Sequence, residues 1–181
     1  MTKALLIIDI QNDYFAGGAM KLVGPEAAAA NASRILASFR EQGLPVIHVQ
    51  HHALSPTATF FLPGTHGVKI HESVSPINGE TVITKNFPNS FRGTNRKDVL
   101  DNLNLEQLVV VGMMTHMCID TSVRAANDFG FKVTLVSDAC ATLDLEYDGR
   151  TVAAADVQAS YLAAIDGSFA TVIATDASVG E

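Results

Sequence analysis

Three residues of complementary chemistry stand at or after the ends of apolar, strand-like runs. Asp9 ends "ALLIID", Lys85 ends "TVITK", and Cys118 follows "QLVVVG" within a few residues. A thiolate can attack a carbonyl carbon while a carboxylate moves the proton, which is the chemistry of acyl transfer. Since a free cysteine titrates at about 8.5, we expect Lys85 and a helix N-terminus to favour the thiolate. Asp9, Lys85 and Cys118 are therefore the predicted catalytic residues.

Six short apolar runs alternate with segments of helical period, which predicts an α/β fold around a parallel sheet. The strands are predicted at 4–9, 45–50, 81–85, 107–112, 132–138 and 170–175. The helices are predicted at 26–40, 96–103, 118–129 and 151–165. Ligands of open parallel sheets bind beyond the carboxyl ends of the strands, so we expect the three residues at that edge. The segment 53–79 is rich in Pro and Gly and is predicted to be a long irregular loop near the site.

The composition of the chain indicates which broad class of protein it belongs to. The chain of 181 residues is 48% hydrophobic and 17% charged, which predicts one compact domain spanning 1–181. A net charge of -7 does not suggest the clustered Lys and Arg residues that bind nucleic-acid phosphates, so we expect a small-molecule partner. The run "ALLIIDI" is too short and too interrupted for a membrane span or signal peptide, which favours a cytoplasmic protein. Two cysteines indicate no disulfide framework.

The cysteine also has ordinary explanations that do not involve catalysis. Free cysteine is often simply buried, and a non-catalytic binding or redox module could use the same crevice and thiol. His116 lies two residues before Cys118 and is a rival activator, but at a helix entrance we expect the two side chains to point apart. Cys140, after the predicted fifth strand, is interpreted as a packing residue.

Three long segments carry a resemblance to a known family. "ALLIIDIQNDYF", "VITKNFPNSFRGT" and "VVVGMMTHMCIDTSVRAANDFGFKVTLVSDACAT" resemble, in order and spacing, the isochorismatase-like cysteine hydrolases. The resemblance covers 4–142, and a family-like helix and strand follow. It implies a three-layer α/β/α fold with a six-stranded parallel sheet of order 3-2-1-4-5-6. It also implies an Asp-Lys-Cys triad, which falls on the three residues already singled out.

The resemblance also bears on activity. Family members with the nucleophilic cysteine cleave amides or ureas, whereas isochorismatases proper hydrolyse a vinyl ether and lack that cysteine. The presence of Cys118 favours hydrolysis of a C–N bond in a small polar amide or ureido compound through a thioester, with vinyl ether hydrolysis as the alternative. The resemblance further implies a homo-oligomer. It implies a cis peptide between Met113 and Met114 that aims the Met114 N–H into an oxyanion hole.

A second set of positions is predicted to bind the oxyanion or the substrate. Its members lie beside the predicted triad in the sequence or at the ends of strands, and they are Gln11, Phe15, His51, Phe91, Met113, Met114 and Thr115. Among them, His51 is expected to donate hydrogen bonds to the ligand, and Phe15 and Phe91 to form aromatic walls.

No metal or other cofactor is predicted. The metal motif D-x-H of nicotinamidases falls on His51, His52 and Ala53, where it is broken. A zinc site formed by His51, His66 and His71 is the alternative, since imidazole suits zinc, but no carboxylate or fixed spacing supports it.

Overall fold

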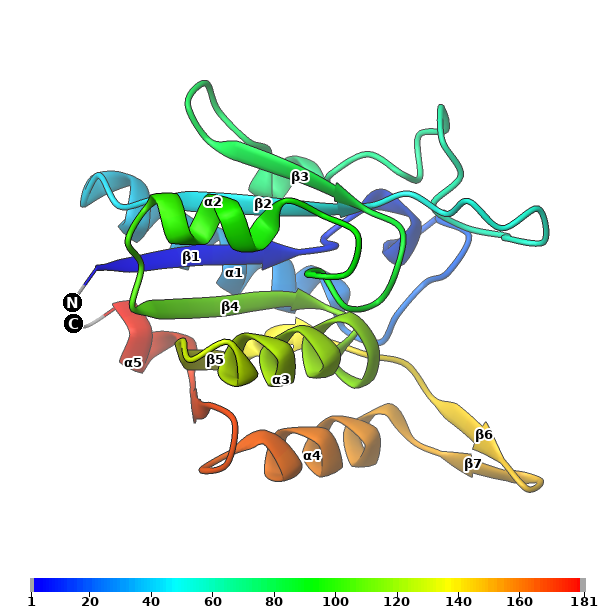
Figure 1. Ribbon diagram of the computed structural model, residues 1–181. Coiled ribbons are helices and arrows are strands. Elements are labelled where there is room, and N and C mark those ends of the chain that lie inside the picture. Colours follow the sequence, from blue (N-terminus) through cyan, green and yellow to red (C-terminus); the bar gives the residue numbers. More distant parts are fainter. Residues whose placement is uncertain (1, 180–181) are drawn as a thin grey trace.

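Six parallel strands form the central sheet of the computed structural model, which describes residues 2–179 (Figure 1). Their order is β3-β2-β1-β4-β5-β8, so the predicted order is confirmed, with β8 as the sixth strand of the sheet. The strands span Lys3–Ile8 (β1), Val46–His51 (β2), Thr81–Lys85 (β3), Gln107–Met113 (β4), Lys132–Ala141 (β5) and Thr171–Ile173 (β8).

Helices cover both faces of the sheet and complete the predicted three-layer α/β/α fold. They span Pro25–Glu41 (α1), Arg96–Asn102 (α2), Asp120–Asp128 (α3), Ala154–Ile165 (α4) and Thr175–Val179 (α5). Helices α1 and α5 lie behind the sheet in Figure 1, and α2, α3 and α4 lie in front of it. Shorter turns occur at Asn12–Tyr14 (η1), Glu72–Val74 (η2) and Thr115–Ile119 (η3). Within residues 2–179, no helix has the length and hydropathy needed to cross a bilayer.

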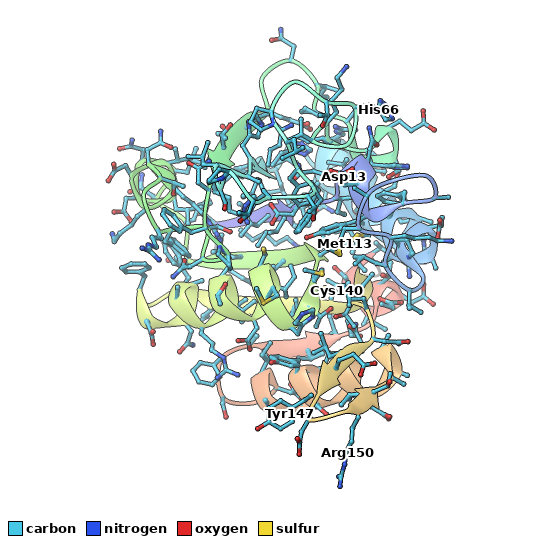
Figure 2. The ribbon with its side chains drawn as sticks, turned by 90° about the vertical axis from the view of Figure 1, so that its right-hand side faces the viewer. Asp13, His66, Met113, Cys140, Tyr147 and Arg150 are labelled. Carbon is cyan, nitrogen blue, oxygen red and sulfur yellow. The ribbon has the colours of Figure 1, made fainter. Side chains whose placement is uncertain are left out.

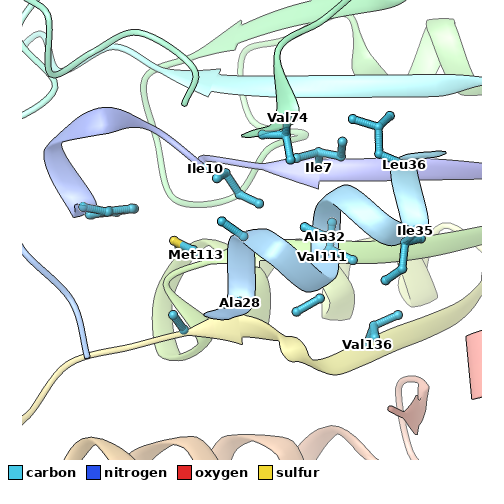
Figure 3. Packing of buried hydrophobic residues seen from close by; sticks show 14 of the residues in the cluster. Ile7, Ile10, Ala28, Ala32, Ile35, Leu36, Val74, Val111, Met113 and Val136 are labelled. Carbon is cyan, nitrogen blue, oxygen red and sulfur yellow. The ribbon is translucent and has the colours of Figure 1, made fainter. Parts of the chain in front are cut away.

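The alternation of side chains along β1 divides the core into two clusters. Leu5 and Ile7 face α1, whose Ala32 and Ile35 pack against them (Figure 3). Leu6, with Ala4 and Ile8, faces the opposite cluster, which includes residues of α2 and α3. Every strand residue from Ala4 to Ile8 is buried. The run is also continuously apolar, as expected for a strand that is covered on both faces. Each buried Leu or Ile contributes roughly 1.5 to 3 kcal/mol.

The predicted helix at 151–165 begins too early. Its first residues belong to an antiparallel hairpin of Leu145–Tyr147 (β6) and Arg150–Val152 (β7), and α4 begins only at Ala154. Asp148 and Gly149 both have positive φ, of 49° and 70°, which is the conformation that a two-residue hairpin turn requires. Tyr147 and Arg150 lie at the lower end of the molecule in Figure 2.

The fifth predicted strand is longer than expected. A register shift between Val110 and Gly112 of β4 allows β5 to keep pairing, so that Gly112 lies opposite Cys140. Cys140 therefore lies inside the strand and not after it, where it is buried and its thiol contacts the Val136 carbonyl at 3.3 Å. After β8, the unpredicted helix α5 begins at Thr175, whose backbone N–H donates to Asp138.

Gly112 is expected to be indispensable for folding. Its φ is +136°, and a Cβ at this position would overlap the Ile8 carbonyl oxygen of β1. Since backbone cannot yield as a flexible side chain does, Gly112→Ala should destabilise the fold by about 3 kcal/mol or more. Gly149→Ala is the matched control, because its φ is also positive but the space around it is open. It should cost only about 1 kcal/mol in urea unfolding. Equal losses in the two variants would contradict the close-approach explanation.

Candidate active site

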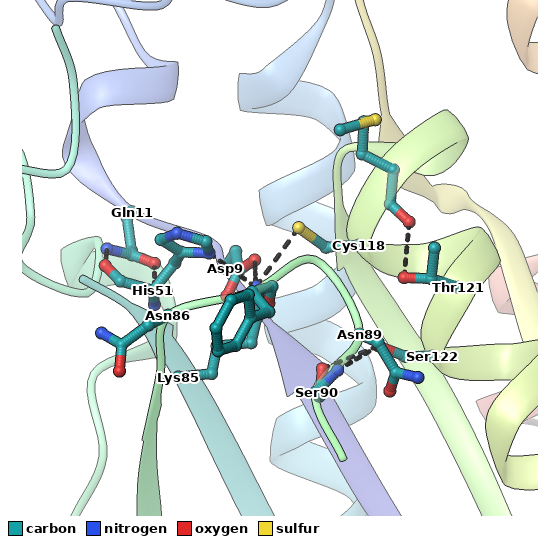
Figure 4. A network of polar contacts seen from close by, with 12 residues as sticks. Asp9, Gln11, His51, Lys85, Asn86, Asn89, Ser90, Cys118, Thr121 and Ser122 are labelled. Atoms are coloured by element: carbon teal, nitrogen blue, oxygen red, sulfur yellow. Dashed lines mark hydrogen bonds and ion pairs between the residues drawn. The ribbon is translucent and has the colours of Figure 1, made fainter. Parts of the chain in front are cut away.

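The carboxyl edge of the sheet brings the three predicted catalytic residues together (Figure 4). Asp9 directly follows β1, Lys85 is the last residue of β3, and Cys118 lies in η3 after β4. Asp9 has a φ of 52°, a left-handed conformation that aspartate tolerates better than most residues. Strand β2 separates β1 from β3, and its last residue, His51, lies opposite Lys85. Lys85 reaches the group with its long aliphatic stem.

The ammonium group of Lys85 is the centre of the cluster. Its Nζ lies 2.6 Å from Asp9 Oδ2, 2.9 Å from His51 Nδ1, 3.2 Å from the Phe87 carbonyl oxygen and 3.3 Å from Cys118 Sγ. Asp9 and Lys85 are completely buried and Cys118 is 5% exposed. An ammonium has three N–H donors for these four acceptors, so its contacts hold the acid, the imidazole and the thiol around one point.

Three residues of this cluster, Asp9, His51 and Cys118, also have the side-chain types and the spacing of metal ligands. One atom each from Asp9, His51 and Cys118 lies within 4.8 Å of the others, and this is the only such group found among residues 2–179. Lys85 contacts all three, so a positive charge already lies among them. The alternative zinc site of His51, His66 and His71 is not formed within this part of the chain. His71 instead bonds Ser73 through Nδ1.

Burial and charge determine the protonation states. Burial lowers the pKa of Lys85, but the neighbouring Asp9 charge and Cys118 outweigh it and hold this pKa above its ordinary value. Burial also raises the pKa of the Cys118 thiol, the Asp9 charge raises it further, and Lys85 opposes both. The expectation that the surroundings favour a thiolate is therefore wrong for this closed arrangement. The thiol is protonated, and it can react only by passing its proton to a nearby group.

His51 is a neutral hydrogen-bonding residue of known tautomer. Burial, followed by the Lys85 charge, lowers its pKa to about 4. Because an ammonium can only donate, Nδ1 of His51 must accept from Lys85, and the ring proton resides on Nε2. Gln11 fixes the backbone of this residue: its amide donates to the His51 carbonyl at 3.0 Å and accepts from the His51 N–H at 2.8 Å.

The segment that carries the thiol is held by polar contacts on both sides. The peptide bond between Met113 and Met114 is cis, as the resemblance predicts. The Thr115 hydroxyl donates to Gln158 of α4 at 2.6 Å, and the His116 ring bonds Thr142 at 2.6 Å. The hydrogen-bond partner of the His116 ring is therefore Thr142, and the rival role of His116 as activator of Cys118 stays a prediction.

Cys118 lies in a π-helical turn and not at the first residue of an α-helix. The helix predicted from residue 118 begins as α3 at Asp120, after η3. Within η3, the Ile119 N–H bonds the Met114 carbonyl five residues earlier. This wider turn follows directly from the end of β4 and sets the position of the thiol above the sheet.

The two predicted aromatic walls make their contacts outside the cluster. Phe15 stacks on His71 with ring centroids 3.8 Å apart, and both line a cavity of about 280 Å³. Phe91 packs against Phe129 at 4.9 Å and under the guanidinium of Arg96 at 4.1 Å. The cavity beside Phe15 contains none of the three cluster residues in its lining.

Tyr14 is a neighbour of the cluster that the sequence reading missed. Burial, followed by electrostatic interactions with Cys118, Asp9 and Asp13, raises the pKa of its phenol well above the ordinary value. Its ring meets Phe61 of the long loop edge-on at 4.7 Å. Its position five residues after Asp9, on the short turn that leaves β1, is the signal that could have identified it.

The long irregular loop predicted at 53–79 covers this edge of the sheet, and the segment after Asp9 anchors it. Gln11 donates to the Val68 carbonyl at 2.7 Å, and Asn12 donates to the His66 carbonyl at 3.1 Å. Asp13, seen near His66 in Figure 2, accepts from the Phe61 N–H at 2.6 Å. The loop is therefore tied to the chain that carries the candidate acid.

A parallel sheet between two helical layers, with an acid, an ammonium and a thiol gathered at its carboxyl edge, places the protein in the α/β class. More particularly, the chain belongs to the isochorismatase family, because residues 3–177 match the model of the isochorismatase domain. It is 50% identical over 177 residues to the isochorismatase family protein YddQ of Bacillus subtilis, and the match covers 98% of each chain.

Two further comparisons agree with this membership. A crystal structure described as an isochorismatase hydrolase of Oleispira antarctica is 50% identical, with a TM-score of 0.96, and the match covers 99% of this chain and 97% of that one. Maleamate amidohydrolase of Pseudomonas putida is 28% identical over 149 residues, which cover 75% of this chain and 70% of the relative. The predicted isochorismatase-like family and the predicted class of enzyme, a hydrolase, are confirmed.

Proposed function

We propose that this protein hydrolyses a C–N bond in a small polar amide or ureido compound, with Cys118 as the nucleophile. The observation that carries the proposal is the position of the Lys85 ammonium, 2.6 Å from Asp9 and 3.3 Å from the Cys118 sulfur. All three side chains are buried, so each strongly affects the charge of the others. The similarity to an amidohydrolase supports a C–N bond as the target.

The first half of the reaction forms a thioester. Asp9 accepts the thiol proton, and the sulfur of Cys118 attacks the substrate carbonyl to give a tetrahedral oxyanion. Lys85 remains charged and stabilises the sulfur anion while it forms. The C–N bond then breaks, and the proton held by Asp9 passes to the leaving nitrogen. The products of this half are a free amine or ammonia and an acyl group bound to Cys118.

The second half of the reaction restores the free thiol. Asp9, again a carboxylate, removes a proton from a water molecule that attacks the thioester carbonyl. Collapse of the second tetrahedral oxyanion breaks the C–S bond, and the proton returns from Asp9 to the Cys118 sulfur. An acid is released. Asp9 therefore acts as the proton acceptor in both halves, first for the protonated thiol and then for the attacking water.

Two groups are assigned to the substrate. The backbone N–H groups of Met114 and Cys118 are the proposed oxyanion donors, and the resemblance implies this role for Met114. The Nε2–H of His51 is the proposed donor to a polar atom of the substrate, since its other nitrogen already accepts from Lys85. Two hydrogen bonds from the Gln11 amide hold the His51 backbone in place.

A panel of small amides, ureas and vinyl ethers tests this proposal. We expect release of ammonia or an amine from at least one amide or ureido compound, together with a thioester adduct at Cys118 detected by rapid-quench mass spectrometry. Release of pyruvate from a vinyl ether without any adduct would contradict the proposal and favour the isochorismatase-type reaction. The absence of turnover on the whole panel, combined with an unreactive Cys118 thiol, would favour a binding module.

A further inference from the structure

A pair of buried serine hydroxyls joins the two segments that follow Lys85 and Cys118 in the chain (Figure 4). Ser90 Oγ lies 2.7 Å from Ser122 Oγ, and the Ser90 backbone N–H donates to Ser122 Oγ at 3.1 Å. Ser90 has no exposed surface and Ser122 is 1% exposed. Because a buried polar group is costly when it lacks a partner, this double contact favours one separation between the two segments.

On one side, the contact constrains the loop that holds the Lys85 ammonium. This loop leaves β3 directly after Lys85, and the ammonium donates to its Phe87 carbonyl at 3.2 Å. Only two residues separate Phe87 from Ser90, and one of them is Pro88, whose ring fixes its own φ. The Thr94 hydroxyl donates to the Ser90 carbonyl at 2.7 Å and braces the loop further. The position of Ser90 therefore restricts where the Phe87 carbonyl can hold the ammonium.

On the other side, the contact constrains the turn that carries the thiol. Ser122 lies four residues after Cys118, in the first turn of α3. Four residues make about one helical turn, so the two side chains lie on similar sides of the helical segment. Ile119 and Val123, which follow them in the chain, are buried in the same apolar cluster as Cys118. A bond at Ser122 therefore restricts movement of the turn that carries the sulfur.

We propose that Ser90 and Ser122 are positioning residues that set the separation of the Lys85 ammonium from the Cys118 sulfur, 3.3 Å in this structure. Strands β3 and β4 are not neighbours, because β2 and β1 lie between them, so sheet pairing does not fix this separation directly. The hydroxyl pair supplies a link between the segments beyond the strand ends. The catalytic meaning of the link rests on the proposed function, but its effect on the separation does not.

Crystal structures of two variants test the geometric effect without any substrate. In Ser122→Ala both bonds to Ser90 are lost, and the distance between the ammonium nitrogen and the sulfur should increase by about 0.5 Å or more. Thr121→Ala is the matched control, because the Thr121 hydroxyl donates to the Met117 carbonyl of its own helical segment at 2.9 Å. In the control the distance should stay near 3.3 Å. An unchanged distance in Ser122→Ala would overturn the proposal.

Steady-state kinetics separate positioning from packing. On the substrate found in the panel, Ser122→Ala should lower kcat by about tenfold or more, because a small misplacement of reacting groups slows the chemical step. Its KM should stay within about twofold of the wild type. The rates are expressed per folded molecule, measured by circular dichroism at the same temperature. A lower Tm with an unchanged kcat per folded molecule would indicate a merely structural pair and overturn the proposal.

The two hydroxyls should behave as one unit in a double-variant cycle. Ser90→Ala keeps the backbone N–H that donates to Ser122, so its loss of kcat should be smaller than that of Ser122→Ala. The double variant should be no slower than Ser122→Ala within about twofold, since the Ser90 hydroxyl has lost its partner. Losses that multiply would overturn the pairing.

Ser90→Ala also replaces Ser122→Ala in the crystallographic test if the latter does not fold, and an unchanged distance there would overturn the proposal. If no compound of the panel is turned over, the hydrolase proposal fails, but the distances in the variants still decide the positioning role.

Discussion

Replacement of Cys118 with alanine is expected to lower kcat/KM by about 10³-fold or more while the fold stays intact. The thioester cannot form without the sulfur, and Cys118 carries the one thiol among residues 2–179 that contacts Lys85. The side chain is small and the neighbouring Lys85 retains its ion pair with Asp9 at 2.6 Å, so the cost in stability should be modest. Initial rates on the substrate found in the panel measure the loss.

Cys140→Ala is the control for this variant. Cys140 is also a buried thiol, but it lies within β5 and bonds the Val136 carbonyl. Its removal should leave kcat/KM within about threefold of the wild type, since it lies outside the reacting group. Hydrolysis by Cys118→Ala at the wild-type rate would eliminate covalent catalysis, and equal losses in both variants would indicate a general effect on packing.

Replacement of Lys85 with methionine is expected to impair both stability and activity. The substitution leaves the fully buried Asp9 carboxylate without its ion-pair partner. Removal of one member of a buried pair typically costs about 3 to 5 kcal/mol, because the remaining charge is uncompensated. The forming sulfur anion would also lose its nearest cation, so kcat/KM should fall by about 10²-fold or more. Urea unfolding and steady-state kinetics measure the two effects.

The double variant Asp9→Asn with Lys85→Met separates the two effects. Removal of both charges should recover part of the lost stability, because no buried ion is left unpaired at this contact. Activity should stay at the background level, since both the proton acceptor and the cation are missing. Additive losses of stability in the double variant would show that the 2.6 Å contact is not an energetically coupled pair.

The strand ends were predictable because parallel strands follow a simple geometric rule. Asp9, Lys85 and Cys118 each stand at or after the end of an apolar run, and the carboxyl ends of parallel strands meet at one edge. The family resemblance supplied the strand order and the cis peptide between Met113 and Met114, and the structure agrees with both. Helix α1 was predicted to within one residue at each end, because its Gly and Pro boundaries are strong signals.

Other features depend on properties that a linear reading does not contain. The protonated state of Cys118 follows from burial, which is a result of tertiary packing and outweighs the attraction of Lys85. The hairpin around Asp148 and Gly149 was overlooked because the alanine-rich sequence after it has a high helical propensity, although Asp-Gly is a recognised turn signal. Arg96 was noted only as the start of a helix, yet its spacing with Leu100 already places it on the apolar stripe.

The attachment of the 53–79 loop has an evolutionary consequence. Gln11, Asn12 and Asp13 reach the loop through its main-chain atoms: the carbonyls of Val68 and His66 and the N–H of Phe61. Main-chain partners are present whatever side chains the loop carries. Mutations can therefore accumulate along the loop and, under the proposed function, alter which molecules are accepted, while its course over the sheet and the cluster of Asp9, Lys85 and Cys118 are preserved. Diversification of specificity within one scaffold would require few compensating changes elsewhere.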